Sequence, residues 1–110
     1  MADVGILTIN HSPAQERYEA FLNAEASPDG ALAEVSVGYL DYVSEPYQVV
    51  ITHTVIREQY SGRGYAGQLV KTVLDDIRSA GKRVVPVCSY VQRYIEQHPE
   101  YADMAEPVPQ

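Results

Sequence analysis

The chain has 110 residues, of which 45% are hydrophobic and 21% charged, and its formal net charge is −7. This length and composition fit one soluble domain, and the acidic balance argues against nucleic acid as a partner, because phosphate backbones need a basic surface. No apolar run approaches the roughly 20 residues of a membrane span, and residues 1–4 lack the basic start of a signal peptide, so we expect no membrane partner and a cytoplasmic location.

The first half of the chain is patterned for antiparallel strands. The apolar run 6–10 allows at most a brief strand, because the turn-forming sequence His11-Ser12-Pro13 follows it. Residues 16–26 and 31–42 alternate with a period of two and predict two longer strands, joined by a turn at residues 27–30. One face of each strand is predicted to gather apolar side chains: Tyr18, Ala20, Leu22 and Ala24 on the first, and Ala33, Val35, Val37 and Tyr39 on the second.

The strongest strand signal and the clearest helix signal lie in the middle of the chain. Residues 47–56 are rich in β-branched side chains and follow a turn at 44–46, so they predict the next main strand. Residues 65–80 carry the apolar stripe of a helix that buries one face, and Gly81 is its natural end. The predicted buried stripe is Leu69, Val70, Val73, Leu74 and Ile77.

After this helix the pattern predicts one more strand and one more helix. The apolar run 84–88 is expected to form a short strand parallel to the preceding one, reached through the helix. Ser89 is a candidate N-cap for a helix at 90–97, and Pro99 would close that helix.

A glycine-rich turn, Ser61-Gly62-Arg63-Gly64-Tyr65-Ala66, joins the central strand to the central helix. Such a turn can wrap an anion, because glycines let the backbone approach an oxygen and the first N–H groups of a helix point at it. A plain tight connection is the alternative. The glycine spacing and the preceding antiparallel strands disfavour a dinucleotide-binding Rossmann turn, and no Gly-Lys-Ser/Thr follows as a Walker loop requires.

Charge is unevenly distributed along the chain. Residues 1–56 hold eight acidic residues and one basic residue, residues 57–93 hold three acidic and seven basic ones, and residues 94–110 hold four acidic ones. The positive charge therefore gathers around the glycine turn. This pattern suits a small polyanionic ligand, with an acidic surround that favours a cationic second substrate. A randomly patchy surface is the alternative.

The glycine turn resembles motif A of the GNAT superfamily of N-acetyltransferases, whose pattern is Gln/Arg-x-x-Gly-x-Gly/Ala. Gly64 and Ala66 fill the last two defined positions, whereas Ser61 stands where Gln or Arg is usual. The wider match is similar to the minimal, single-domain branch of that superfamily, the YjdJ type, and covers roughly residues 16–104. It rests on three further stretches: Thr52-His53-Thr54-Val55, Val85-Pro86-Val87-Cys88-Ser89-Tyr90-Val91 and Tyr94-Ile95-Glu96-Gln97-His98-Pro99-Glu100-Tyr101.

The resemblance implies an α+β fold, with a curved mixed β-sheet, one helix after the cofactor turn and a second helix after strand five. It implies one N-acetyltransferase domain at residues 1–104, followed by a flexible tail at 105–110. Acetyl-CoA would be the cosubstrate, with its pantetheine arm along the strand before the turn and its pyrophosphate on the turn. The residues implied are Thr54, Val55 and Ile56 for the arm, and Ser61, Gly62, Arg63, Gly64, Tyr65, Ala66 and Gly67 for the pyrophosphate.

His53 and Cys88 are the candidate catalytic residues. A histidine in a β-branched strand, with Val49 and Ile51 on its own side, is ordinarily a core residue, but a neutral imidazole here could take a proton from an incoming ammonium or a thiol. A cysteine ending an apolar strand is ordinarily a small hydrophobe, but a helix N-terminus beside it favours the thiolate. The resemblance puts the two on opposite sides of the acetyl group, with Cys88 either accepting the acetyl group or protonating the departing CoA thiolate.

Tyr90 and Tyr94, one helical turn apart, are open to two interpretations: packing in the core, or forming a wall for the pantetheine. His11 and His98 lack metal-like spacing with other ligands, and we predict no metal. The expected function is transfer of acetyl from acetyl-CoA to an amine, either a protein lysine or a small cationic amine. The alternative is a non-catalytic module that binds or senses CoA.

Overall fold

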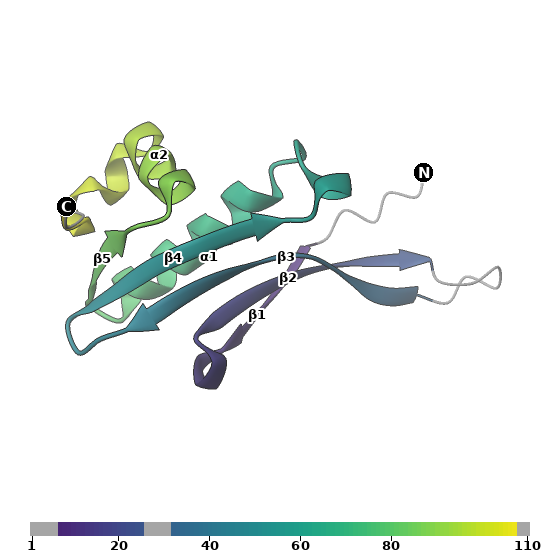
Figure 1. The fold of residues 1–110 in the computed structure, drawn as a ribbon, viewed down its shortest axis with the longest axis horizontal. Helices are drawn as coiled ribbons and strands as arrows, with labels where there is room; N and C mark the ends of the chain where they lie inside the picture. Colours follow the sequence, from purple (N-terminus) through teal and green to yellow (C-terminus); the bar gives the residue numbers. More distant parts are fainter. Residues whose placement is uncertain (1–6, 26–31, 108–110) are drawn as a thin grey trace.

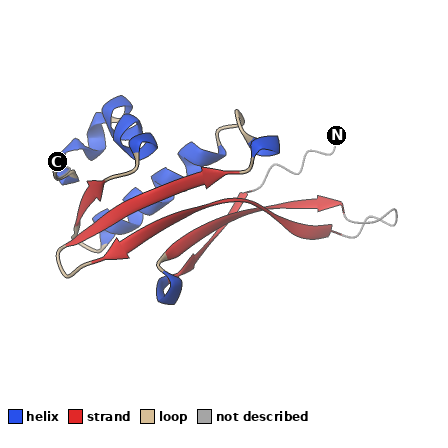
Figure 2. Ribbon diagram, in the orientation of Figure 1, coloured by secondary structure: helices blue, strands red, loops and turns tan. Residues whose placement is uncertain are grey.

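Five strands form one mixed sheet in the order β1-β2-β3-β4-β5 (Figure 1). The computed structural model describes residues 7–25 and 32–107. The strands are β1 (Leu7–Ser12), β2 (Arg17–Glu25), β3 (Leu32–Ser44), β4 (Gln48–Ile56) and β5 (Arg83–Pro86). The first four pair antiparallel with their neighbours, and β5 pairs parallel to β4. The α+β fold with a mixed sheet, predicted from the sequence, is therefore confirmed (Figure 2).

Within the described part of the chain, two α-helices and three short 3-10 helices accompany the sheet. They are η1 (Pro13–Gln15), η2 (Glu58–Tyr60), α1 (Tyr65–Ser79), α2 (Ser89–Gln97) and η3 (Pro99–Met104). α1 runs along one face of the sheet, and α2 and η3 lie at its β5 end (Figure 1). None of these helices is long and apolar enough to cross a membrane.

The core lies between α1 and the sheet. The predicted stripe of α1 is buried throughout, which confirms that prediction, and Tyr18, Ala20 and Leu22 of the predicted β2 face are also buried. Leu40 of β3 and Ile51 of β4 are fully buried opposite the helix. Burial of this apolar surface holds α1 against the strands, and it thereby fixes where the glycine turn at the start of α1 lies.

An irregularity in β3 changes which of its side chains face α1. The pairing of β2 with β3 skips Val37. Because one unpaired residue reverses the alternation of a strand, Leu40 and Tyr42 are buried together with Val37. The prediction that Tyr39 shares the buried face with Val37 is therefore wrong. Tyr39 is only half-buried, and its ring lies 4.1 Å from the guanidinium carbon of Arg17.

A second irregularity occurs in β4 and moves a candidate catalytic residue. The pairing of β4 with β3 skips Thr52, since His53 pairs with Asp41 while Ile51 pairs with the next residue of β3. The alternation reverses there, so His53 lies on the face opposite to Val49 and Ile51. The prediction that His53 shares their side is wrong, and consistent with this His53 is exposed whereas the other two are buried.

Several element boundaries also differ from the sequence prediction. β1 continues through Ser12, because the chain turns only at η1 before pairing back along β2. β5 ends at Pro86, and Cys88 rather than Ser89 is the N-cap residue of α2. The turn predicted at residues 27–30 lies outside the described residues.

The chain beyond α2 packs back onto the sheet. Pro99 follows α2 as predicted, but it also opens η3. Ala105 then forms a parallel bridge with Val84 of β5, and the N–H of Glu106 donates to the Val84 carbonyl at 2.8 Å. The Glu106 carboxylate pairs with Arg83. Ala105 and Glu106 thus lie along the edge of the sheet beside β5.

Candidate functional site

The strands β4 and β5 separate halfway along β4. Their pairing runs from Gln48 to Ile51, whose partner is Pro86. One further hydrogen bond joins the segments, from the N–H of Cys88 to the Ile51 carbonyl at 3.0 Å. Among the described residues no strand pairs with the β5-facing edge of β4 at residues 52–56. That edge can therefore pair with an extended ligand in the way that a strand would.

The glycine turn leads from η2 into α1. Gly62 and Gly64 have φ angles of 77° and 81°, in the left-handed region, and an added Cβ at either would meet nothing within 4 Å. Glycine is needed here for backbone conformation rather than for space. Gly64 is the N-cap residue of α1, and no side chain of the described residues caps the first N–H groups of that helix. Those N–H groups and the positive end of the helix dipole fit an anion.

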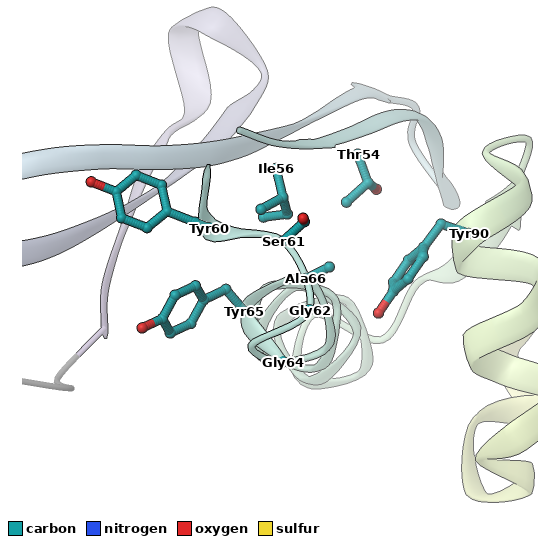
Figure 3. Close-up of a pocket in the computed structure, with 9 residues that line it drawn as sticks. All are labelled: Thr54, Ile56, Tyr60, Ser61, Gly62, Gly64, Tyr65, Ala66 and Tyr90. Atoms are coloured by element: carbon teal, nitrogen blue, oxygen red, sulfur yellow. The ribbon is translucent and has the colours of Figure 1, made fainter. Parts of the chain in front are cut away.

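A cleft of about 400 Å³ lies between β4, the glycine turn and α2. Thr54 and Ile56 point from β4 toward the turn, and Tyr90 faces them from α2 (Figure 3). Nine residues line the cleft, and eight of them belong to the set predicted to bind acetyl-CoA. The lining is Thr54, Ile56, Tyr60, Ser61, Gly62, Gly64, Tyr65, Ala66 and Tyr90.

Tyr60 is the lining residue that the sequence analysis missed. It ends η2 and is half-buried at the mouth of the glycine turn (Figure 3). The guanidinium carbon of Arg63 lies 5.9 Å from the centre of its ring, so the two are close enough for a cation–π contact. An aromatic residue directly before the turn, followed by a cation three residues later, was the available signal in the sequence.

The groups around the cleft suit an anion. Arg63 does not line the cleft, but it is exposed on the glycine turn and adds positive charge there. Arg57 lies just before the turn, and its Nε donates to the Ser36 carbonyl at 3.0 Å.

In the part of the chain that the structure describes, no group of three or more His, Cys, Asp or Glu side chains lies close enough together to hold a metal ion.

Three other predicted cofactor residues, Val55, Gly67 and Tyr94, do not line the cleft. Val55 does not line the cleft, because it lies on the opposite face of β4 from its neighbours and is 38% exposed. Gly67 lies where α1 meets α2, and an added Cβ would be 3.7 Å from the Tyr94 ring and 3.8 Å from the Tyr90 hydroxyl. Tyr94 is buried and stacks on His98 at 3.9 Å between ring centres. Tyr94 therefore packs in the core, while Tyr90 lines the cleft and burial raises the pKa of its hydroxyl.

Cys88 lies where β5 leaves β4. It is half-buried, and its thiol donates a long hydrogen bond to Thr54, with 3.6 Å between Sγ and Oγ1. Since Thr54 lines the cleft, the thiol contacts a residue of the cleft wall without lining the cleft itself. Cys88 is also the N-cap residue of α2, so it lies at the positive end of that helix's dipole.

His53 lies on the other face of β4. It is exposed, and its Nδ1 is 3.1 Å from the Thr52 hydroxyl. Its cross-strand partner Asp41 is held by Arg17, with 2.7 Å between Nε and Oδ1. No hydrogen bond joins His53 to Cys88 among the described residues. The two predicted catalytic residues therefore lie on different sides of β4 rather than in contact.

Sequence comparisons place these features in a known family. A family model described as GCN5-related N-acetyl-transferase matches residues 25–104. The chain is 31% identical over 61 residues to Protein NATD1 of Mus musculus, covering 54% of this chain and 56% of that protein. It matches Protein NATD1 of Homo sapiens at the same identity, covering 54% of each. The matched region thus spans about half the length of these curated relatives.

A protein of solved structure has the same fold as this chain. The solution structure of a GCN5-like protein from Staphylococcus aureus superposes with a TM-score of 0.64, covering 100% of this chain and 95% of that one. The two sequences are 16% identical, so this likeness shows the fold and not the substrate.

Proposed function

This chain belongs to the GCN5-related N-acetyltransferase family, and on that premise we propose that it binds acetyl-CoA beside the glycine turn and transfers acetyl to an amine. One observation carries the proposal: in the described structure an uncapped helix N-terminus and an unpaired stretch of the β4 edge border one cleft, and the Cys88 thiol contacts Thr54 in its wall. Bound acetyl-CoA would supply an acetyl group activated as a thioester.

Different residues around the cleft are proposed to bind different parts of acetyl-CoA. The N–H groups of residues 62–67 bind the pyrophosphate, with Arg63 adding positive charge from outside the cleft. The β4 edge at residues 54–56 pairs with the amide-containing pantetheine arm. Tyr60 and Tyr90 supply aromatic walls, which are typical of small-molecule sites.

Cys88 is proposed to serve the leaving group. Its thiol, oriented by Thr54, donates a proton to the CoA thiolate as the carbon–sulfur bond breaks. A covalent route uses the same atom. In that route Sγ attacks the thioester carbon, CoA leaves with a proton, and the amine then attacks S-acetyl-cysteine to form the amide and restore the thiol.

His53 is proposed to prepare the acceptor. An ammonium group must lose a proton before its nitrogen can attack a carbonyl carbon, and a neutral imidazole can take that proton. Because His53 is exposed on the face of β4 away from the cleft residues, the acceptor would approach from that face. The acceptor is a protein lysine or a small cationic amine, which the net charge of −7 would attract.

The test is CoA release and intact mass after incubation with acetyl-CoA and a panel of amines. Cys88→Ala and His53→Ala are each expected to lower turnover by about a hundredfold or more, with affinity for CoA nearly unchanged. Ser89→Ala, an exposed neighbour on α2, is the matched control and should behave like the wild type. A one-acetyl adduct on Cys88 would support the covalent route over direct transfer.

Two outcomes would contradict these assignments. Undiminished turnover in both variants would remove His53 and Cys88 from the chemistry. Tight CoA binding without amine-dependent release, for every amine tried, would favour the non-catalytic CoA-binding module instead.

A further inference from the structure

A second cavity lies at the opposite end of α1 from the glycine turn. It measures about 290 Å³, close to the lower limit of about 300 Å³ for small-molecule sites, and it shares no lining residue with the first cleft. Its walls come from β1 to β4 and from the last turn of α1. Its aromatic, charged and hydroxyl-bearing lining residues are His11, Tyr18, Tyr42, Ser44, Asp76 and Lys82.

Three rings form one wall of this cavity. His11 stacks on Tyr18 with 4.0 Å between ring centres and 4° between planes. Tyr42 is tilted by 50° to His11 and by 51° to Tyr18, at 5.7 Å from each. His11 Nε2 and the Tyr42 hydroxyl share a hydrogen bond of 2.5 Å. These contacts fix the rings as a rigid aromatic corner, the kind of surface that attracts a cationic group.

Two opposite charges also line the cavity without neutralising each other. Asp76 accepts a hydrogen bond of 2.9 Å from the Tyr18 hydroxyl, and Lys82 donates one of 3.2 Å to the Ser44 hydroxyl. Neither Asp76 nor Lys82 forms an ion pair with any residue that the structure describes. Each charge is therefore held by a neutral hydroxyl and remains available to a ligand.

The position of Lys82 follows from how α1 ends. Gly81 has a φ of 73°, and its N–H donates to the Arg78 carbonyl at 3.0 Å. The Lys82 N–H donates to the Ile77 carbonyl at 3.2 Å, which completes a Schellman motif. This closed turn brings the lysine back beside the last turn of α1, on the cavity side that Asp76 also lines.

We propose that this cavity binds a small zwitterion of the α-amino-acid class. Asp76 pairs with the ammonium group, the aromatic corner adds a cation–π contribution, and Lys82 pairs with the carboxylate. A simple amine would be repelled by Lys82, and a simple carboxylate by Asp76, so a ligand that carries both charges is favoured over either. This proposal does not rest on acetyl-CoA binding, because the two cavities share no lining residue.

The test is a titration of the full chain with each common amino acid in turn, followed by amide chemical shifts. At least one amino acid is expected to shift the amides of His11 and of residues 76–82. Its decarboxylated amine and its deaminated acid, each keeping one charge, should bind about tenfold more weakly or worse, because each forfeits one charge-assisted contact. The proposal is overturned if no amino acid at about 10 mM shifts these amides, or if either single-charge analogue binds equally well.

Substitution of the two charged residues, Asp76 and Lys82, gives a second test of the proposal. Asp76→Asn still accepts the bond from Tyr18 but loses the charge, and Lys82→Gln loses the cation, so each should weaken binding about tenfold. Glu96→Gln and Arg93→Gln remove the same charges from exposed positions of α2 and should leave the affinity unchanged. Equal affinity in Asp76→Asn and the wild type would also overturn the proposal.

Discussion

The two ends of α1 treat their backbone groups in opposite ways. At the first end the N-cap residue Gly64 has no side chain, and no described side chain caps the N–H groups there. At the other end the N–H groups of Gly81 and Lys82 donate to the carbonyls of Arg78 and Ile77. Each end uses a glycine with a positive φ, 81° and 73°. A glycine thus leaves the N–H groups at the start of α1 open to an anion, whereas a glycine at the end of α1 closes the helix. At that closed end the charged side chains of Asp76 and Lys82, rather than backbone groups, line the second cavity.

The largest effects are expected from the matched substitutions Gly64→Ala and Gly81→Ala, one at each end of α1. A Cβ has space at both positions, so only the left-handed backbone is penalised, and each should lower the free energy of unfolding by about 1–2 kcal/mol. Only Gly64→Ala should also weaken acetyl-CoA binding, by about tenfold, because the N–H groups that face the anion are displaced. Urea unfolding and calorimetric titration measure the two effects.

Each glycine variant is the control for the other. If both lost affinity for acetyl-CoA to the same extent, the loss would reflect general damage to α1, and the assignment of the cofactor to one end of the helix would fail.

A smaller effect is expected at Asp75, which lines neither cavity and joins α1 to η3. The Asp75 carboxylate accepts hydrogen bonds from Lys71 at 2.8 Å and from the Tyr101 hydroxyl at 2.6 Å. Lys71 first, and then Tyr101, hold the pKa of Asp75 below its ordinary value of 3.8. The stabilisation is therefore present above pH 3.8 and is lost as the pH falls through the lowered folded-state pKa.

Asp75→Asn should accordingly lower the free energy of unfolding at pH 7 by about 1 kcal/mol or less, because these contacts are partly exposed. The difference from the wild type should shrink on acidification, measured by urea unfolding at a series of pH values. Neither acetyl-CoA nor amino-acid affinity should change. A difference that grew as the pH fell would contradict the assigned role of Asp75.

Local patterns predicted the elements that position the cleft. The stripe of α1, with Leu69 and Leu74 fully buried, is a periodic signal within one segment, and Gly81 ends that helix where expected. At Gly62 and Gly64 the turn needs a left-handed backbone conformation that only glycine adopts easily, so the sequence predicts this turn as well. Most of the other residues that line the cleft were named from the resemblance to the N-acetyltransferase family, not from local patterns.

Features set by contacts between distant segments were not predictable in the same way. The skipped residues Val37 and Thr52 depend on how one strand pairs with the next, and alternation within a strand does not reveal them. The error at Thr52 matters most, because it moved His53 to the other face. The second cavity was not anticipated either, since His11, Tyr18 and Asp76 come from three separate elements.

The proposal that acetyl-CoA binds beside the glycine turn is tested most directly by an amide chemical-shift titration of the isotope-labelled chain with acetyl-CoA. We expect shifts of the amides of residues 54–56, of residues 60–67 and of Cys88, whereas the amides of Gly81 and Lys82 should not shift. Saturating acetyl-CoA that left the amides of residues 60–67 unshifted would contradict this proposal.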